Sequence, residues 1–424
     1  MVASTDIKFY VHTNNNAPQL QNAYGSMINV LDACLVNGIN IGTVSSLTTS
    51  GTIVTALFSS AHNLMQYQVI KITGANQPEF NGEHRVLTIP NAQSVTFELA
   101  SVPSVTTATG TIEASLPPLG WEKPFGNTGG KAAYRSKNLL LPSRPFLRVV
   151  DELDPAYTAT YAKYAKVGIV EDMTDIDTML GVQAPFDAVN PDKNWIGTGS
   201  STAAINGWAK WYYAHSNTPN NSYSDTGAPA SGARKYLIVG NRDVFYVMPS
   251  VTPTANALCY GFGAFNSTLG VDNAAVFLSA TVSSGAVSSL PSMGSVTPLT
   301  GFSTSRYLIL QRPQSNQNFY ATALCTTLRN TYGEHDSGYF NYINTAAALG
   351  FAPLFPVFLL ETQISMSATA PNLFRGDLSL LYWLAQSAPY SDLQVYMNSD
   401  GVFIAKNVTT GNRPGQIILK VGEV

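Results

Sequence analysis

The sequence predicts a mainly β protein of the α+β class: a small β-barrel or sandwich module, then a large β-rich domain with short helices. Three observations predict this class. Runs rich in Val, Ile, Thr and Phe alternate apolar with polar residues over 42–115. Turn residues such as Asn and Gly separate these runs at short, regular intervals. Strand-like runs such as RKYLIVGNRDVFYVMPS then dominate the remainder of the chain.

Composition limits the classes of function. The chain has 424 residues, more than one hydrophobic core usually serves, so we expect several domains. Charged residues make up only 12%, about half the usual share of roughly 25%. A subunit that buries much of its surface in an assembly needs little charge. With 23 Lys and Arg against 26 Asp and Glu, no basic excess is left to neutralise phosphates, so we expect no nucleic-acid partner.

Cysteine usage and hydropathy exclude two further classes. Cys34, Cys259 and Cys325 are far apart and form no CxxC pair, so neither a disulfide framework nor a thiolate metal site is indicated. The first residues lack the order of a signal peptide. The longest apolar run, 349–360, is too short to cross a bilayer and contains two prolines. We therefore expect no cofactor, no metal and no membrane contact, and synthesis in a cytoplasm.

Residues 1–24 are predicted to form an arm. This segment is rich in Asn and Gln and too polar to form a core, so we expect a partner to order it. The side chains expected to make that contact are Asn14, Asn15, Asn16, Gln19 and Gln21. In 25–41, GSMINVLDACLVNG has apolar residues at helical spacing, with Ser26 suited to the N-cap and Gly38 to the position after the helix. One amphipathic helix and a connection are expected there.

Residues 42–115 are predicted to fold as the small module, with five or six strands. Asn81-Gly82 is its sharpest turn signal and favours a tight hairpin. His62, Glu83 and His84 also lie here. A metal site would need a third ligand and a reason for the side chains to converge, and the sequence supplies neither, so we interpret these residues as turn and edge positions.

Residues 116–138 are predicted to form a linker, because prolines and glycines punctuate them. Gly129-Gly130-Lys131 resembles part of a phosphate-binding loop. Phe125 stands where that loop needs its first glycine, however, and Ala132 stands where it needs Ser or Thr, so the match fails. Trp121 and Phe125 are expected to anchor the linker on a neighbouring surface or partner.

Residues 139–424 are predicted to form the large β-rich domain, with short helices at 156–168, 202–216 and 377–385. In the second of these, Trp208, Trp211 and Tyr212 would lie close together on a helix. Such aromatic rings could stack on a glycan. The same spacing equally suits a stripe of core residues, so both interpretations stay open.

Catalytic constellations are not evident. EDMTDIDTM (171–179) lacks the spacing of a calcium loop and is interpreted as a solvated helix start. GEHDSG (333–338) crowds Glu334, His335 and Asp336 into one turn, where neighbours rarely converge on one atom. Arg375-Gly376-Asp377 matches a short adhesion motif that occurs often by chance, and we interpret it as a turn. We expect no catalytic residue and no enzyme activity.

Four runs carry a resemblance: APQLQNAYGSMINVLDACLVNG (17–38), LGWEKPFGNTGGKAAYR (119–135), LFRGDLSLLYWL (373–384) and VTTGNRPGQIILKV (408–421). Together with the small β module, they resemble a family of virion structural proteins of tailed bacteriophages. The resemblance implies a non-enzymatic neck-, collar- or tail-associated subunit, located in the virion after assembly in the host cytoplasm. Its partners would be copies of itself, in a ring or sleeve, and other virion proteins. The alternatives are a receptor- or glycan-binding tail or baseplate protein and, third, a secreted hydrolase.

Overall fold

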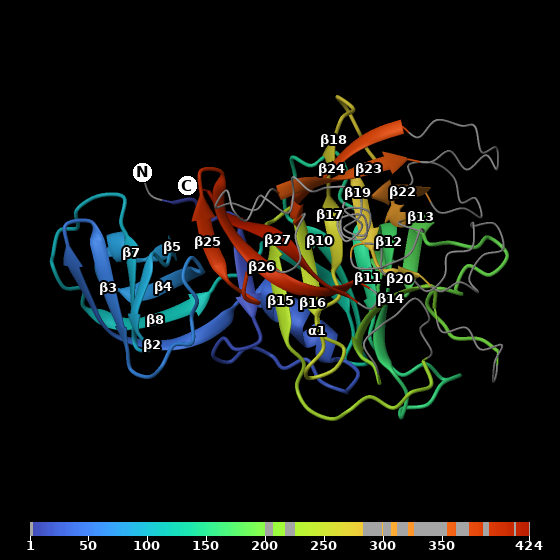
Figure 1. Cartoon of the computed structure of the whole chain (residues 1–424), viewed down its shortest axis with the longest axis horizontal. Helices are drawn as coiled ribbons and strands as arrows, with labels where there is room; N and C mark the ends of the chain where they lie inside the picture. The colour runs from blue at the N-terminus through green and yellow to red at the C-terminus, as the bar shows by residue number, and fades with distance from the viewer. Residues whose placement is uncertain are drawn as a thin grey trace.

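The computed structural model describes residues 3–199, 207–216, 225–282, 299, 307–311, 321–325, 354–361, 373–384, 390–410 and 413–423. Within these residues the chain forms three antiparallel sheets and one helical segment, so the fold class is mainly β as the sequence predicts. Figure 1 shows a small lobe, built by the strands that follow the helical segment, beside a larger body that holds the other two sheets.

The small lobe is the barrel module, residues 39–116. Residues 82–85 pair with the strand Val69–Ala75, and residues 88–91 pair with the strand Ser94–Glu98. These two short segments form the opposite ends of one sheet, which curls round on itself. His84 accordingly stacks on Phe97, with ring centroids 4.3 Å apart. In spatial order the strands are β5 (Gly82–Arg85), β4 (Val69–Ala75), β8 (Gly110–Leu116), β2 (Ile39–Ser50), β3 (Ile53–Phe58), β7 (Ser94–Glu98) and β6 (Thr88–Asn91).

The tight hairpin expected at Asn81-Gly82 is not formed. A 3-10 turn, η2 (Pro78–Phe80), lengthens the connection between β4 and β5, and Asn81 keeps a negative φ of −78°. Its side chain instead closes the loop, because Asn81 Oδ1 accepts the N–H of Ala75 at 3.1 Å and Nδ2 donates to the Ala75 carbonyl at 2.7 Å. Asn81 therefore stabilises the loop through its side chain instead of forming a tight two-residue turn with Gly82.

The large sheet of the body contains thirteen of the described strands and curls so that its two ends face each other. Leu237 and Met248 from its first strands share a buried cluster with Ile404 and Leu419 from its last. In spatial order the strands are β1 (Lys8–Val11), β15 (Tyr236–Gly240), β16 (Val244–Pro249), β17 (Tyr260–Ala264), β19 (Val276–Ser279), β21 (Tyr307–Leu310), β22 (Ala321–Cys325), β23 (Leu354–Glu361), β24 (Leu373–Leu384), β27 (Arg413–Gly422), β26 (Gly401–Thr410) and β25 (Val395–Asn398), while β18 (Asn266–Ser267) pairs with β24.

The third sheet, formed by strands between residues 121 and 282, packs on the outer face of the large sheet, and we call it the cover sheet. Aromatic residues fill the space between them: Trp211 of the cover sheet stacks on Tyr260 with ring centroids 5.9 Å apart, and Trp121 meets Phe245 edge-on at 5.1 Å. In spatial order its strands are β20 (Thr281–Val282), β14 (Ala209–Ala214), β12 (Lys163–Asp175), β11 (Phe146–Val150), β10 (Lys131–Ser136) and β9 (Trp121–Gly126), and β13 (Thr178–Ala184) pairs with the far half of β12.

The helix predicted at 25–38 is confirmed, as α1 (Ser26–Leu31) running into a π-helical segment, η1 (Asp32–Asn37). Gly38 follows it with a φ of +81°, a conformation that glycine adopts without strain. The N-cap is Gly25 rather than Ser26. The acceptor for the first free N–H groups comes from the cover sheet, because Asp151 Oδ2 accepts from Met27 at 3.0 Å.

Three predicted helices are wrong. Residues 163–168 belong to β12, residues 209–214 to β14 and residues 377–384 to β24, and all of these are strands. Every residue of β14 is buried, so its aromatic run shows no alternation and its spacing imitates a helix. The acidic stretch at 171–177 is likewise strand and turn rather than a helix start.

The predicted linker at 116–138 is also wrong. Residues 121–136 form a hairpin, β9 and β10, at the edge of the cover sheet, with Pro124 inside its edge strand and Gly129 and Gly130 in its turn. Gly130 takes a φ of +107° in the turn, where an added Cβ would stand only 2.5 Å from the Asp151 carbonyl oxygen. The glycines therefore serve a tight turn on a sheet edge.

Burial raises the pKa of Asp151 to about 6, although Tyr213 and the helix N–H groups donate to it. Because the folded pKa lies above the unfolded value, its contribution to stability is fully present below about pH 4 and is lost as the pH rises through about 6. Relative to Asp151→Asn, we expect the wild type to lose about 3 kcal/mol of unfolding free energy over this window. Urea titrations of both proteins at a series of pH values measure this difference, and a constant difference would contradict the assignment.

Candidate functional site

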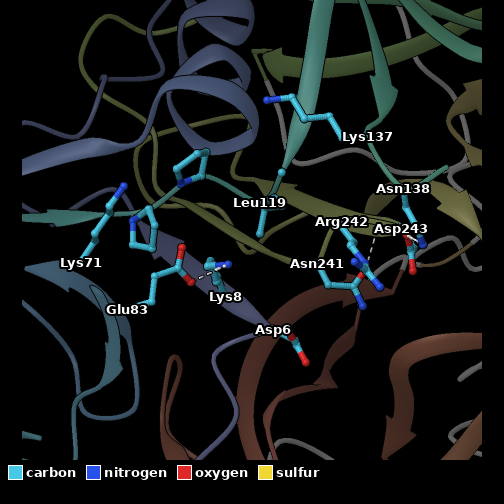
Figure 2. Close-up of a pocket in the computed structure, with 13 residues that line it drawn as sticks. Asp6, Lys8, Lys71, Glu83, Leu119, Lys137, Asn138, Asn241, Arg242 and Asp243 are labelled. Atoms are coloured by element: carbon cyan, nitrogen blue, oxygen red, sulfur yellow. Dashed lines mark hydrogen bonds and ion pairs between the residues drawn. The ribbon is translucent and has the colours of Figure 1, made fainter. Parts of the chain in front are cut away.

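The candidate site is a pocket of about 580 Å³ at the seam between the barrel module and the body. We call it the seam pocket. Figure 2 shows that its lining residues come from segments far apart in the sequence. They are residues 6 and 8 of the arm, Lys71 and Glu83 of the module, 117–120 at the module exit, 137–138 after β10, and the β15–β16 turn at 241–243.

Cations outnumber anions among the groups that line this pocket without an ion pair. Lys8 Nζ lies 3.1 Å from Glu83 Oε2, which pairs two of the charges across the seam (Figure 2). Lys71, Lys137 and Arg242 are exposed, and none of the three has an ion-pair partner among the residues that the structure describes. Asp6 and Asp243 also line the pocket without an ion-pair partner among the described residues, so the lining has four cations against three carboxylates, a net charge of +1.

The turn that carries Arg242 is held firmly. Asn241 Oδ1 accepts the N–H groups of Asp243 and Val244 at 2.8 and 3.0 Å. Trp121 Nε1 in turn donates to the Asn241 carbonyl at 2.9 Å. Because Trp121 is packed between the two sheets of the body, this hydrogen bond fixes the turn to the core.

Next to the pocket, Arg85 joins the module to both ends of the chain. Its side chain is buried, and its guanidinium donates to the carbonyls of Ser4, Ile7, Tyr67 and Val421 at distances of 2.5 to 3.1 Å. Burial lowers the pKa of Arg85 to about 10, so the group remains charged at neutral pH. The positive charge is thus surrounded by carbonyl dipoles from the arm, the module and β27.

A second contact beside Arg85 is made of two buried amides. Asn14 Nδ2 donates to Gln68 Oε1 at 2.9 Å, and Gln68 Nε2 donates back to Asn14 Oδ1 at 3.0 Å. Gln68 Nε2 also reaches the carbonyl of Phe9 at 2.9 Å. Because Gln68 is fully buried, water does not compete for these hydrogen bonds, and they hold the arm against the module.

The arm is ordered on its own chain, and the expectation that only a partner orders it is wrong. β1 pairs with β15, and Asn14 is 3% exposed. Asn15 Nδ2 donates to the Ala61 carbonyl and Asn16 Nδ2 to the Asn40 carbonyl. Gln19 donates to carbonyls within the arm, and its side chain, like that of Gln21, faces solvent. Partner contacts by the exposed arm residues remain a prediction.

The aromatic residues proposed for contacts pack within the body, where four of them are buried and Phe125 is half-buried. Trp121 is 1% exposed, and Phe125 packs on Phe146 with ring centroids 5.6 Å apart, so both anchor the cover sheet itself. Trp208, Trp211 and Tyr212 are each at most 1% exposed. Rings buried in this way are not available for stacking on a sugar, so the core interpretation of that spacing holds.

The other singled-out residues have structural partners. His62 Nδ1 accepts the N–H of Leu64 at 2.9 Å, and His84 Nε2 lies 3.0 Å from the Phe80 carbonyl. Arg375 is in strand β24, not in a turn, and forms an ion pair of 2.9 Å with Asp272. Glu334, His335 and Asp336 lie outside the described residues.

Sequence reasoning missed the residues of the seam. Lys71, Lys137 and Arg242 are single cations separated by long stretches of chain, and no local pattern indicates that they meet. Arg85 sits in an ordinary strand run, HRVLTI, and only its burial in the folded chain reveals its role. A charged residue among alternating apolar positions was the one available signal.

Within the described ranges, no three or more His, Cys, Asp or Glu side chains gather as they would around a metal ion. In the same part of the chain, no helix is both long and apolar enough to cross a membrane.

Comparisons with known proteins yield little similarity. No family model matches the chain, and no curated protein matches it. Among solved structures, the chain is similar to the endosialidase of phage phi92, with 10% sequence identity and a TM-score of 0.16, over 91% of this chain and 52% of the other. The chain thus spans about half the length of that protein.

We expect Arg85→Met to lower the unfolding free energy by about 3 kcal/mol, because it leaves buried carbonyls without a donor. Arg85→Lys keeps the charge but cannot reach all four oxygens, so its loss should be smaller yet measurable. Urea unfolding followed by tryptophan fluorescence measures both. Arg135→Met is the matched control: Arg135 pairs with Glu122 with 33% of its side chain exposed, and its loss should stay below about 1 kcal/mol. Equal losses at both sites would refute the role of Arg85.

Proposed function

We propose that the chain is a structural subunit of a tailed-phage virion, associated with the neck or tail, and that it acts by protein–protein assembly rather than by catalysis. The observation that carries this proposal is where two runs of the resemblance lie. Residues 17–38 form the second half of the arm, α1 and η1, and residues 119–135 form the β9–β10 hairpin.

These two runs are in direct contact although the barrel module separates them in the sequence. Asp32 of η1 binds both strands of the hairpin, because Lys123 forms an ion pair with it and the Tyr134 hydroxyl donates to its Oδ1 at 2.7 Å. The two runs therefore form one contiguous structural unit, and the barrel module is inserted between them in the sequence.

The surface chemistry supports assembly as well. The chain has only 12% charged residues, and its exposed polar surface includes amides such as Asn16, Gln19 and Gln21. Uncharged polar groups are less costly to desolvate than charges when a partner supplies hydrogen bonds. Such a surface suits repeated contact between subunits.

The glycan-binding alternative loses the aromatic residues named for it, because Trp208, Trp211 and Tyr212 are buried. The densest titratable cluster of the sequence, residues 333–338, lies outside the described part of the chain, so the structure does not bear on the hydrolase alternative there.

The proposal predicts that this chain is part of the infectious particle. Antibodies raised against the purified protein should label purified particles at one axial position on the neck or tail, visible by electron microscopy, and mass spectrometry should find the chain in those particles at a multiple-copy ratio. A protein found in lysates of infected cells but absent from purified particles would contradict the proposal.

We also expect the purified chain to show no glycosidase, peptidase or nuclease turnover, with or without added divalent metal ions. The matched comparison is the double variant Glu334→Gln, His335→Ala, which changes the densest titratable cluster of the sequence. Turnover by the wild type that this variant lacks would replace the structural role with an enzymatic one.

A further inference from the structure

We propose that the seam pocket is a docking site for the acidic β12–β13 hairpin of a second copy of this chain. The inference rests on the proposed function, which it deepens by naming the contact between copies. The site itself is the rim of the pocket, where the exposed Lys71, Lys137 and Arg242 have no ion-pair partner among the described residues. These three cations outnumber the two carboxylates of the lining that are likewise without an ion pair, Asp6 and Asp243. The pocket of about 580 Å³ below them has room for several side chains.

The chain itself offers a complementary surface. The hairpin that joins β12 to β13 presents Asp172 and Asp175, both exposed and both without a cationic partner in the part of the chain that the structure describes. Among the described residues, their carboxylates accept hydrogen bonds only from backbone N–H groups of the hairpin: Asp172 Oδ1 from Met173 and Asp175 Oδ1 from Asp177. The charges are therefore available to a partner.

Apolar side chains flank the charges on both surfaces. Directly after Lys137 and Asn138, Leu139 and Leu140 are 79% and 86% exposed. On the hairpin, Leu180 is 42% exposed and is the register partner of Asp172. A leucine beside a charge on each surface gives a contact with an apolar centre and a charged edge, the composition usual for specific protein interfaces.

The two surfaces lie on different parts of the molecule. In Figure 1 the β12–β13 hairpin is in the body, away from the barrel module, whereas the pocket is at the junction with that module. One copy therefore cannot fill its own pocket with its own hairpin. Contact between two different patches is head-to-tail, and repeating it produces a closed ring or an open helical array.

Charge exchange on the full-length chain tests the proposal. Sedimentation velocity should show wild-type self-association that weakens as salt increases, because the contact is electrostatic. Reversing the pocket (Lys137→Glu with Arg242→Glu) or the hairpin (Asp172→Lys with Asp175→Lys) should weaken association at least about tenfold. An equimolar mixture of the two variants should associate again, since each supplies the surface that its partner needs.

Two matched controls change charge elsewhere. Lys235→Glu, at the opposite end of β15 from Arg242, and Asp400→Lys, in the β25–β26 turn, should associate as the wild type does. The proposal is overturned if either reversed variant associates normally, if the mixture does not recover, or if the wild type remains monomeric at its highest soluble concentration. In any of these cases, labelling of the chain in purified particles would still support the proposed function, so the two failures are distinguishable.

Discussion

One buried guanidinium sets the arrangement of the whole molecule. Arg85 reaches carbonyls in the arm, the module and strand β27, so residues from both ends of the chain meet at one side chain of the inserted module. A buried charge without hydrogen-bonding partners is strongly destabilising, so the group is tolerated only while all three segments surround it. The position of the module, the path of the arm and the end of the last strand therefore depend on one another, and the arm and the module also contribute residues to the seam pocket.

The arm completes this arrangement through neutral amides. Asn14 and Gln68 each donate to the other, and both are buried, so neither can be replaced by a residue that only accepts or only donates. Beyond this pair, β1 extends the large sheet by one strand and covers the edge of β15. Covering an edge removes a row of unpaired backbone groups that would otherwise invite unspecific pairing.

Much of the fold could be predicted because local patterns decide it. Alternation between 42 and 115 predicts the barrel module, and the spacing of Met27, Leu31 and Leu35 predicts the helix. The helix predicted over 209–214 was wrong because every residue of that strand is buried, which removes the alternation that identifies a strand. Over 377–384, the buried residues Leu378 and Leu381 lie three positions apart, a helix-like spacing, and Leu380 between them takes a φ of +66°. The arm and the edge hairpin β9–β10 were misjudged because their order comes from residues more than 50 positions away, such as Gln68 for Asn14. The seam cations were missed for the same reason.

The central claim is that the arm and Arg85 fasten the module to the body within a single chain. Native-state hydrogen exchange on the full-length protein, followed by mass spectrometry of arm peptides, tests this most directly. Amides of residues 8–11 and 14 should exchange as slowly as those of β15 and β16, because they share one sheet and one set of buried hydrogen bonds. Exchange of the arm within seconds, while β15 and β16 remain protected, would show that the arm is not docked on its own chain and would contradict the account.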